Sequence, residues 1–196
     1  GEDERPARKL ADAAIMAIAL HADPSAGRAL DEFTAAGQPQ KVREQAIFWL
    51  GSARCKAGFE RLRQLVRNDS SDAIREKTIF ALHICKEAEA VDEMIRSAKQ
   101  DGSARVRGQA LFWLAQRAGS KAAAAINEAI ENDPETEVKK KAVFALSQMP
   151  KDQGVPKLIE VARTNRNPAV RKQAMFWLGQ SNDPRAVAFF EEVLKK

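Results

Sequence analysis

A short motif of the type Val-Arg-x-Gln recurs along this chain at one unvarying interval. Its copies begin at positions 42, 74, 106, 138 and 170, so each lies 32 residues after the one before it. An Ala or Thr, a Phe and a Leu follow each copy at the same distances. Such an interval is typical of repeat proteins, in which every unit buries its apolar face against its neighbour. The sequence therefore predicts an array of one repeated module.

A degenerate first copy, with Leu10, Ala14, Met16 and Ile18 in register, extends the array toward the amino end of the chain. Six copies of 32 residues account for almost all of the 196 residues. We therefore predict a single repeat domain over residues 1–196. The predicted repeats span about 5–36, 37–68, 69–100, 101–132, 133–164 and 165–196.

Each copy contains two amphipathic segments. In the first, which we call the Val-Arg helix, apolar residues follow the leading Val or Ile after four, five and eight residues. At 100° per residue these positions form one stripe, which predicts an α-helix of about 12 to 15 residues. The second segment has the same helical character. Its aligned apolar positions are Leu30, Leu62, Met94, Ile126, Leu158 and Phe190. Helix pairs this short must stack on one another to bury their stripes, so the predicted fold is an all-α solenoid.

Composition excludes several function classes. Lys and Arg number 32 against 27 Asp and Glu, and a net charge of +5 by itself selects no partner. Charged residues or Gln interrupt every apolar run before the roughly 18 residues of a membrane-spanning helix are reached. No nucleophile–base pair, phosphate-binding Gly-rich turn or cluster of metal ligands is present among these residues. We therefore expect no enzyme activity, no cofactor and no metal.

The two cysteines, Cys55 and Cys85, fall near the ends of Val-Arg helices in adjacent repeats, so a disulfide between them is conceivable. A disulfide needs a Cα separation of about 4.4–6.8 Å, which is shorter than the roughly 8–10 Å between packed helices. We therefore favour two free thiols. The two histidines, His21 and His83, lie about two repeats apart, which argues against a shared metal site.

The turn before each Val-Arg helix and the helix itself follow the pattern Asp-x-x-x-x-Val-Arg-x-x-Ala-x-x-x-Leu, seen with small substitutions at 69–82, 101–114 and 133–146. This pattern resembles HEAT-like repeats of the short bacterial type, as in phycobilin-lyase-like proteins, over essentially the whole chain. The resemblance implies a right-handed α-solenoid of six helix pairs whose Val-Arg helices line the concave surface. It says little about function, because that family includes lyase subunits, DNA glycosylases and pure scaffolds.

The resemblance also implies a ladder of ion pairs between neighbouring repeats. In the family, the Asp of the turn pairs with the Arg that opens the Val-Arg helix. The ladder should be weaker at Gly37 and Asn165, which replace the Asp, and at Lys139, which replaces the Arg. The residues that would form it here are Asp69, Asp101, Asp133, Arg43, Arg75, Arg107 and Arg171.

A column of phenylalanines forms the first candidate site. These residues stand six positions after the leading Val or Ile, at about 240° on the helix, whereas the core stripe centres near 65°. The column should therefore face away from the core, and exposed apolar patches usually mark interaction sites. Packing of the rings against the next helix is the alternative. The column consists of Phe48, Phe80, Phe112, Phe144 and Phe176.

The two positions that flank this column alternate in step. A Gln one turn before a Trp occurs in every second copy, and Lys77 and Lys141 take the place of the Gln in the other copies. An amide beside an indole resembles the arrangement by which importin-alpha holds an extended peptide, with Gln here in place of Asn. Large-against-small packing of Trp with Ala between repeats is the alternative, and both interpretations stay open. The pairs are Gln45 with Trp49, Gln109 with Trp113 and Gln173 with Trp177.

We hypothesise a non-catalytic scaffold that binds an extended peptide or a partner domain in a concave groove lined by these residues, and we expect a monomer. The second hypothesis is a nucleic-acid-binding protein related to the HEAT-like glycosylases for alkylated DNA bases. Glu44, Glu76 and Glu137 disfavour it, because they mix negative charge with the groove's lysines. The opening helix, about Pro6 to His21, has no partner helix before it, which suggests a longer parent protein. The location is left open between the cytoplasm and the soluble part of an exported bacterial protein.

Overall fold

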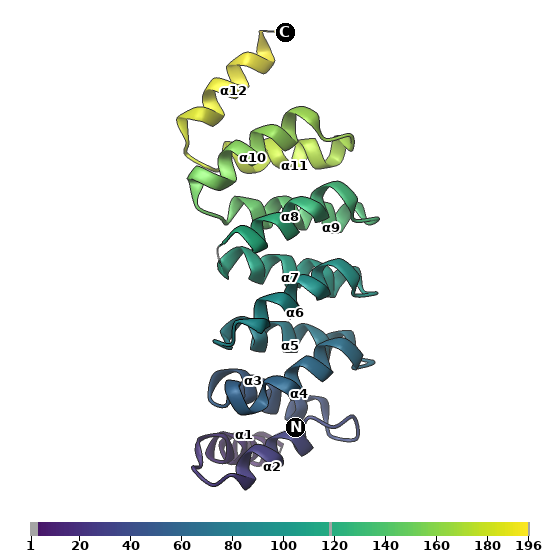
Figure 1. The fold of residues 1–196 in the computed structure, drawn as a ribbon, viewed down its shortest axis with the longest axis vertical. Helices are drawn as coiled ribbons and strands as arrows, with labels where there is room; N and C mark the ends of the chain where they lie inside the picture. The colour runs from purple at the N-terminus through teal and green to yellow at the C-terminus, as the bar shows by residue number, and fades with distance from the viewer. Residues whose placement is uncertain (1–3, 118, 196) are drawn as a thin grey trace. The chain divides into compact units, whose positions relative to one another are not determined.

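The computed structural model describes residues 4–117 and 119–195, and these residues form α-helices joined by short turns (Figure 1). No strand occurs among the described residues. The helices are α1 (Glu4–Leu20), α2 (Ser25–Phe33), α3 (Gln40–Ser52), α4 (Cys55–Asn68), α5 (Asp72–Ile84), α6 (Glu89–Gln100), α7 (Ala104–Arg117), α8 (Ser120–Asn132), α9 (Thr136–Ser147), α10 (Lys151–Thr164), α11 (Pro168–Gly179) and α12 (Pro184–Leu194). Each predicted repeat thus contains one pair of helices.

The chain divides into two compact units, Gly1–Met94 and Ile95–Lys196, which we call the N-terminal and C-terminal units. In the N-terminal unit, α3 packs between α1 and α5, and α2 and α4 form a second layer against them. In the C-terminal unit, α9 packs between α7 and α11, with α8, α10 and α12 in the second layer. The stacked helix pairs confirm the predicted all-α, solenoid-type repeat fold. The right-handed sense, the period and the single domain remain predictions.

The apolar stripe of the Val-Arg helix forms the core, as its spacing predicts. In α5, Ile74, Ile79 and Leu82 are completely buried. Thr78 lies in the same stripe and is also buried. Its hydroxyl donates to the carbonyl oxygen of Ile74 at 2.8 Å, so burial leaves this polar group with a hydrogen-bond partner. Burying one such aliphatic side chain stabilises the fold by roughly 1.5–3 kcal/mol. Repetition of this stripe in each copy supplies most of the driving force for stacking.

Two of the Val-Arg helices approach each other closely at Gly51. A Cβ atom on this residue of α3 would lie 2.5 Å from the carbonyl oxygen of Ala81 in α5 and 2.8 Å from its Cα. Both of these atoms belong to the backbone, so they could not move aside without shifting a helix. The absence of a side chain at Gly51 therefore sets the spacing of α3 and α5 near their carboxyl ends.

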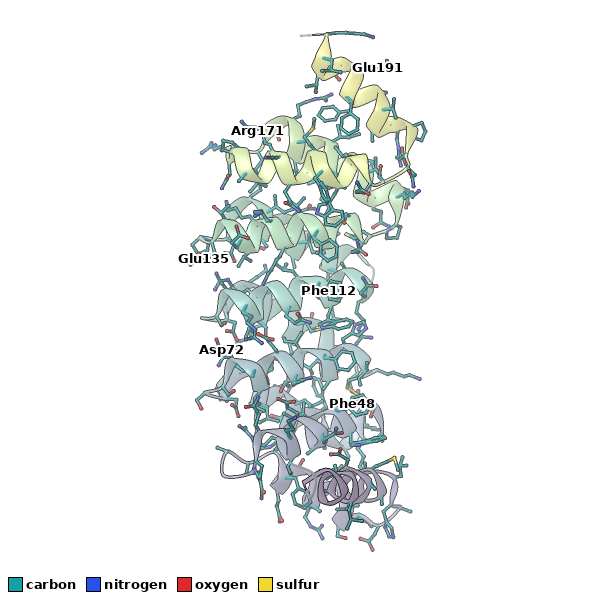
Figure 2. All side chains as sticks on the ribbon, turned by 180° about the vertical axis from the view of Figure 1, so that it is seen from behind. Phe48, Asp72, Phe112, Glu135, Arg171 and Glu191 are labelled. Carbon is teal, nitrogen blue, oxygen red and sulfur yellow. A yellow bond between two sulfur atoms is a disulfide. The ribbon has the colours of Figure 1, made fainter. Side chains whose placement is uncertain are left out.

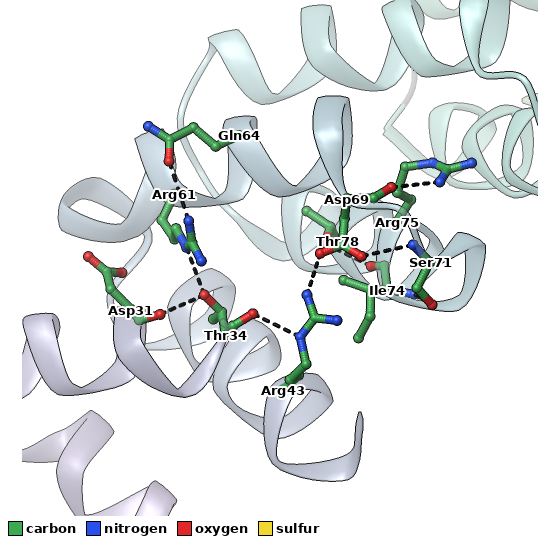
Figure 3. A network of polar contacts seen from close by, with 10 residues as sticks. All are labelled: Asp31, Thr34, Arg43, Arg61, Gln64, Asp69, Ser71, Ile74, Arg75 and Thr78. Atoms are coloured by element: carbon green, nitrogen blue, oxygen red, sulfur yellow. Dashed lines mark hydrogen bonds and ion pairs between the residues drawn. The ribbon is translucent and has the colours of Figure 1, made fainter. Parts of the chain in front are cut away.

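Each unit contains a step of the predicted ion-pair ladder. In the N-terminal unit Arg43 pairs with Asp69 and also donates from Nε to the carbonyl oxygen of Thr34 at 2.8 Å (Figure 3). In the C-terminal unit the guanidinium of Arg107 donates twice to the carboxylate of Asp133, at 2.7 and 3.0 Å. These hydrogen bonds raise the pKa of Arg107. Both steps join a Val-Arg helix to the turn of the following repeat.

The ladder changes where the family pattern is broken. Lys139 donates instead to a backbone oxygen, that of Glu131, at 2.6 Å. Arg171 donates to the backbone oxygen of Asn165 at 2.8 Å, as Arg107 does to that of Asp101 at 2.9 Å. At the step from Lys139 to the turn at Asn165, the buried charge pair is thus replaced by a bond between a cation and a carbonyl group.

Cys55 and Cys85 form a disulfide, so the expectation of two free thiols is wrong. Their Cα atoms are 5.2 Å apart, well inside the range that a disulfide allows. The error came from using the spacing between helix axes. Cys55 is the first residue of α4 and Cys85 directly follows α5, so both lie at helix ends, which approach more closely than the helix axes do.

Candidate functional site

The predicted phenylalanines of each unit form what we call its aromatic row, and in the N-terminal unit two of these rings stack on one another. The rings of Phe48 on α3 and Phe80 on α5 have centroids 6.3 Å apart and an angle of 13° between their planes. Trp49 meets Phe48 edge-on at 5.1 Å. Phe48 is 36% exposed, and Phe80 and Trp49 are half-buried. These rings pack against each other and still present part of their surface to solvent.

The C-terminal unit repeats this arrangement over three helices. Phe112 on α7 and Phe144 on α9 stack at 5.9 Å with only 8° between their planes. Trp177 on α11 lies 4.8 Å from Phe144, and Phe176 meets Trp177 edge-on at 4.9 Å. Phe176 is the most exposed ring of the row, at 54%, while Phe112 and Phe144 are half-buried. Figure 2 labels one ring of the row in each unit, Phe48 and Phe112.

The position of the phenylalanines on their helices, at about 240°, therefore predicts only part of their packing. The rings leave their helices on the side opposite the core, but they lean along the surface to stack on the next Val-Arg helix. Near-parallel stacking contributes to the packing of neighbouring repeats. The exposed remainder of each ring is available for contact. Binding of a partner to this exposed ring surface remains a prediction.

The glutamines beside the tryptophans have unused hydrogen-bonding groups. The side chains of Gln45, Gln109 and Gln173 are half-buried, and their amides have no hydrogen-bond partner among the described residues. Each amide offers one acceptor and two donor hydrogens. The indole nitrogen of Trp177 is fully buried and has no hydrogen-bond partner either, so this indole contributes its ring surface rather than its N–H.

The lysines that alternate with these glutamines are exposed. Lys141 on α9 extends across α7 at Gly108, where an added Cβ atom would lie 2.3 Å from Lys141 Cδ. Its aliphatic stem thus lies against the backbone of α7, which leaves the ammonium group at the surface. Lys77 is the corresponding exposed lysine on α5. Each unit therefore brings glutamine, lysine and aromatic side chains together on its Val-Arg helices.

His83 extends the aromatic row and was not predicted as part of it. Its ring stacks on Phe80 with centroids 6.4 Å apart and 27° between the planes. The signal for this contact was the spacing of three residues on one helix, which places the two side chains on the same side. Because His83 is considered from the sequence only as a metal ligand, this contact is not predicted.

Other kinds of site find little support in the part of the chain that the structure describes. No three His, Cys, Asp or Glu side chains of these residues converge in a way that could hold a metal ion. Within the same residues, no helix combines the length and the apolar character required to cross a bilayer.

Comparison with known proteins agrees with the repeat pattern. The family model described as HEAT repeats matches residues 28–115, 92–164 and 122–196, which together cover most of the chain. No curated protein sequence matches. Among solved structures the chain is similar to human deoxyhypusine hydroxylase in complex with glycerol, with a TM-score of 0.44 and 20% identity over 93% of this chain and 72% of that one. The chain belongs to the HEAT-repeat family.

Proposed function

We propose that this chain is a non-catalytic binding scaffold whose aromatic row holds an extended, acidic polypeptide segment with interspersed apolar side chains. One observation carries the proposal: partly exposed aromatic rings lie beside half-buried glutamine amides that have no partner within the described residues. Each such amide can both donate and accept hydrogen bonds when a ligand displaces the water around it.

An extended peptide fits these groups because its backbone alternates donors and acceptors, and one glutamine amide can satisfy both. In the C-terminal unit Gln109 and Gln173 lie on α7 and α11, with α9 between them. At about 8–10 Å per helix they are roughly 20 Å apart. About six residues of extended chain would span that distance, at about 3.3 Å per residue. The rings between the two glutamines then meet the peptide's apolar side chains.

Charge favours the C-terminal unit as the main docking surface for an acidic segment. Lys141 and Lys172 are exposed there, at neighbouring positions of their Val-Arg helices. Lys140 is partly neutralised by Glu137, whose carboxylate lies 3.0 Å away. In the N-terminal unit the corresponding region carries Glu44 and Glu76, which would repel an acidic peptide. Complementary charge of this kind adds chiefly to the rate and specificity of association.

Random 16-residue peptides displayed on phage would test the proposal by selection on the purified protein. We expect enrichment of peptides that combine Asp or Glu with Leu, Ile, Val or Phe. Substitution Phe176→Ser should weaken their binding about tenfold, since it removes an apolar contact of roughly 1.4 kcal/mol. Val187→Ser is the matched control, because Val187 is similarly exposed, at 57%, but lies on α12 in the second layer.

Failure of the selection to enrich any such peptide would overturn the proposal, as would equal losses of affinity in the two variants. A thymidine oligonucleotide is the competing probe. Binding to it that exceeds peptide binding and falls steeply with salt would instead support the nucleic-acid hypothesis. Excision of an alkylated base would support an enzyme.

A further inference from the structure

The disulfide between Cys55 and Cys85 is asymmetric in its access to solvent. Cys85 has no exposed surface, whereas Cys55 is only half-buried. Cys55 also lines an open cavity of about 440 Å³ in the N-terminal unit. Of the two cysteines, Cys55 is thus the one that a thiol in this cavity can reach. Access decides which sulfur of a disulfide is attacked.

The cavity is formed by the end of α1 and the start of α4. Its ionisable lining residues are His21, Arg54 and Lys56, and no carboxylate of the described residues lines it. Arg54 is held in place because its guanidinium donates to the carbonyl oxygens of Ala19, at 2.9 Å, and His21. Cys55 is also the first residue of α4, so its sulfur lies at the positive end of the helix dipole. These positive charges attract an anionic thiol to the side of the disulfide on which Cys55 lies.

We propose that Cys55 is a site of thiol–disulfide exchange with a small thiol that carries carboxylate groups. The attacking thiolate forms a new S–S bond to Cys55 Sγ while the bond between Cys55 and Cys85 breaks. The electron pair of that bond goes to Cys85 Sγ, which takes up the proton that the attacking thiol lost when it formed its thiolate. The product is a mixed disulfide on Cys55 and a thiol at Cys85. Attack by Cys85 on the mixed disulfide reverses the reaction and releases the small thiol. This inference is independent of the proposed function.

Glutathione serves as the anionic probe and 2-mercaptoethanol as the neutral one. The oxidised protein is incubated with glutathione under native conditions, quenched in acid, alkylated and digested, and the two cysteine-containing peptides are analysed by mass spectrometry. We expect glutathione on Cys55 and the alkylating group on Cys85. Adducts on Cys85, adducts on both in equal amounts, or reaction only after the protein is unfolded in urea would each overturn the proposal.

The single variants Cys85→Ser and Cys55→Ser keep the test decisive if the mixed disulfide in the natural protein reverses too fast to trap. With oxidised glutathione, the thiol of Cys55 in Cys85→Ser should react more than tenfold faster than the thiol of Cys85 in Cys55→Ser. Circular dichroism confirms that each variant is folded. Equal rates in two folded variants would contradict the proposed asymmetry.

The role of charge is tested separately with Lys56→Gln, which removes one cation from the cavity. It should slow the reaction with glutathione about threefold, as expected for one charge at about 6 Å in water, and leave that with 2-mercaptoethanol unchanged. Lys86→Gln is the matched control, because Lys86 is exposed next to Cys85 but does not line the cavity. Equal slowing by both variants, or equal slowing with both thiols, would refute a charged cavity that selects anionic thiols.

Discussion

Reduction of the disulfide should destabilise the N-terminal unit by an amount that follows from its place in the chain. Cys55 and Cys85 are 30 residues apart in sequence, so the bond closes a loop of about this length in the unfolded chain. The loop-entropy relation for 30 residues gives about 12 cal/mol/K, or about 3.6 kcal/mol at 25 °C. This difference changes the folding equilibrium constant more than a hundredfold.

Urea unfolding of the oxidised protein and of the protein reduced with a phosphine would measure this free energy. Hydrogen exchange followed by mass spectrometry would localise it. Protection of peptides from α3, α4 and α5 should fall on reduction, because the bond ties the start of α4 to the end of α5. Peptides from α9 and α11 contain no cysteine and serve as the internal control.

A loss of less than 1 kcal/mol would refute the reasoning. Such a small loss would mean that Cys55 and Cys85 already lie close together in the reduced, unfolded chain. It would also result if the bond did not form in solution. Equal loss of protection in α9 and α11 would show that reduction acts by some route other than the loop in the N-terminal unit.

Three further predictions concern Gly51, Asp133 and Asp183. Gly51→Ala should lower the free energy of unfolding by about 1–3 kcal/mol, because the new Cβ atom would collide with the backbone of α5. Gly27→Ala should raise this free energy by about 0.5–1 kcal/mol, because the space around Gly27 is open and Ala favours a helix. Urea unfolding tests both substitutions. Asp133→Asn should cost roughly 3 kcal/mol in the same assay, since it leaves the buried guanidinium of Arg107 without its anion, and a cost below 1 kcal/mol would show that the pair matters little. The pKa of Asp183 is lowered to about 2, chiefly by the hydrogen bond that it accepts from the side chain of Arg185. The contribution of the Asp183 carboxylate to stability is therefore present above about pH 4 and is lost as the pH falls from there toward 2. Stability of Asp183→Asn, measured by urea unfolding at about pH 2 to 4, should lack this contribution of the carboxylate. The same pH dependence in Asp183→Asn and in the natural protein would contradict the role of Asp183.

Local sequence patterns were enough to predict the modules of this protein. Helix formation and the choice of core residues depend on spacing within about 15 residues, and Ile74, Ile79 and Leu82 are buried as their spacing predicts. The described helices also follow one another in pairs along the chain. Neither result needs information from a distant part of the chain.

Contacts between repeats were predicted less well, because they depend on how closely particular helix ends and side chains approach. The spacing of helix axes argued against the disulfide of Cys55 and Cys85, and only the short distance between helix ends allows it. The helical angle placed Phe112 away from the core but carried no information on its stacking with Phe144 on the next helix.

The sequence by itself determined that this protein is a stack of helix pairs and which face of each helix is buried, since a period of 3.6 residues is a local property. Tertiary structure alone decided the positions of atoms from different repeats relative to one another. These positions result from the close packing of whole helices, where a single missing Cβ atom, as at Gly51, changes the spacing. The aromatic row, the disulfide and the cavity beside Cys55 all depend on that packing.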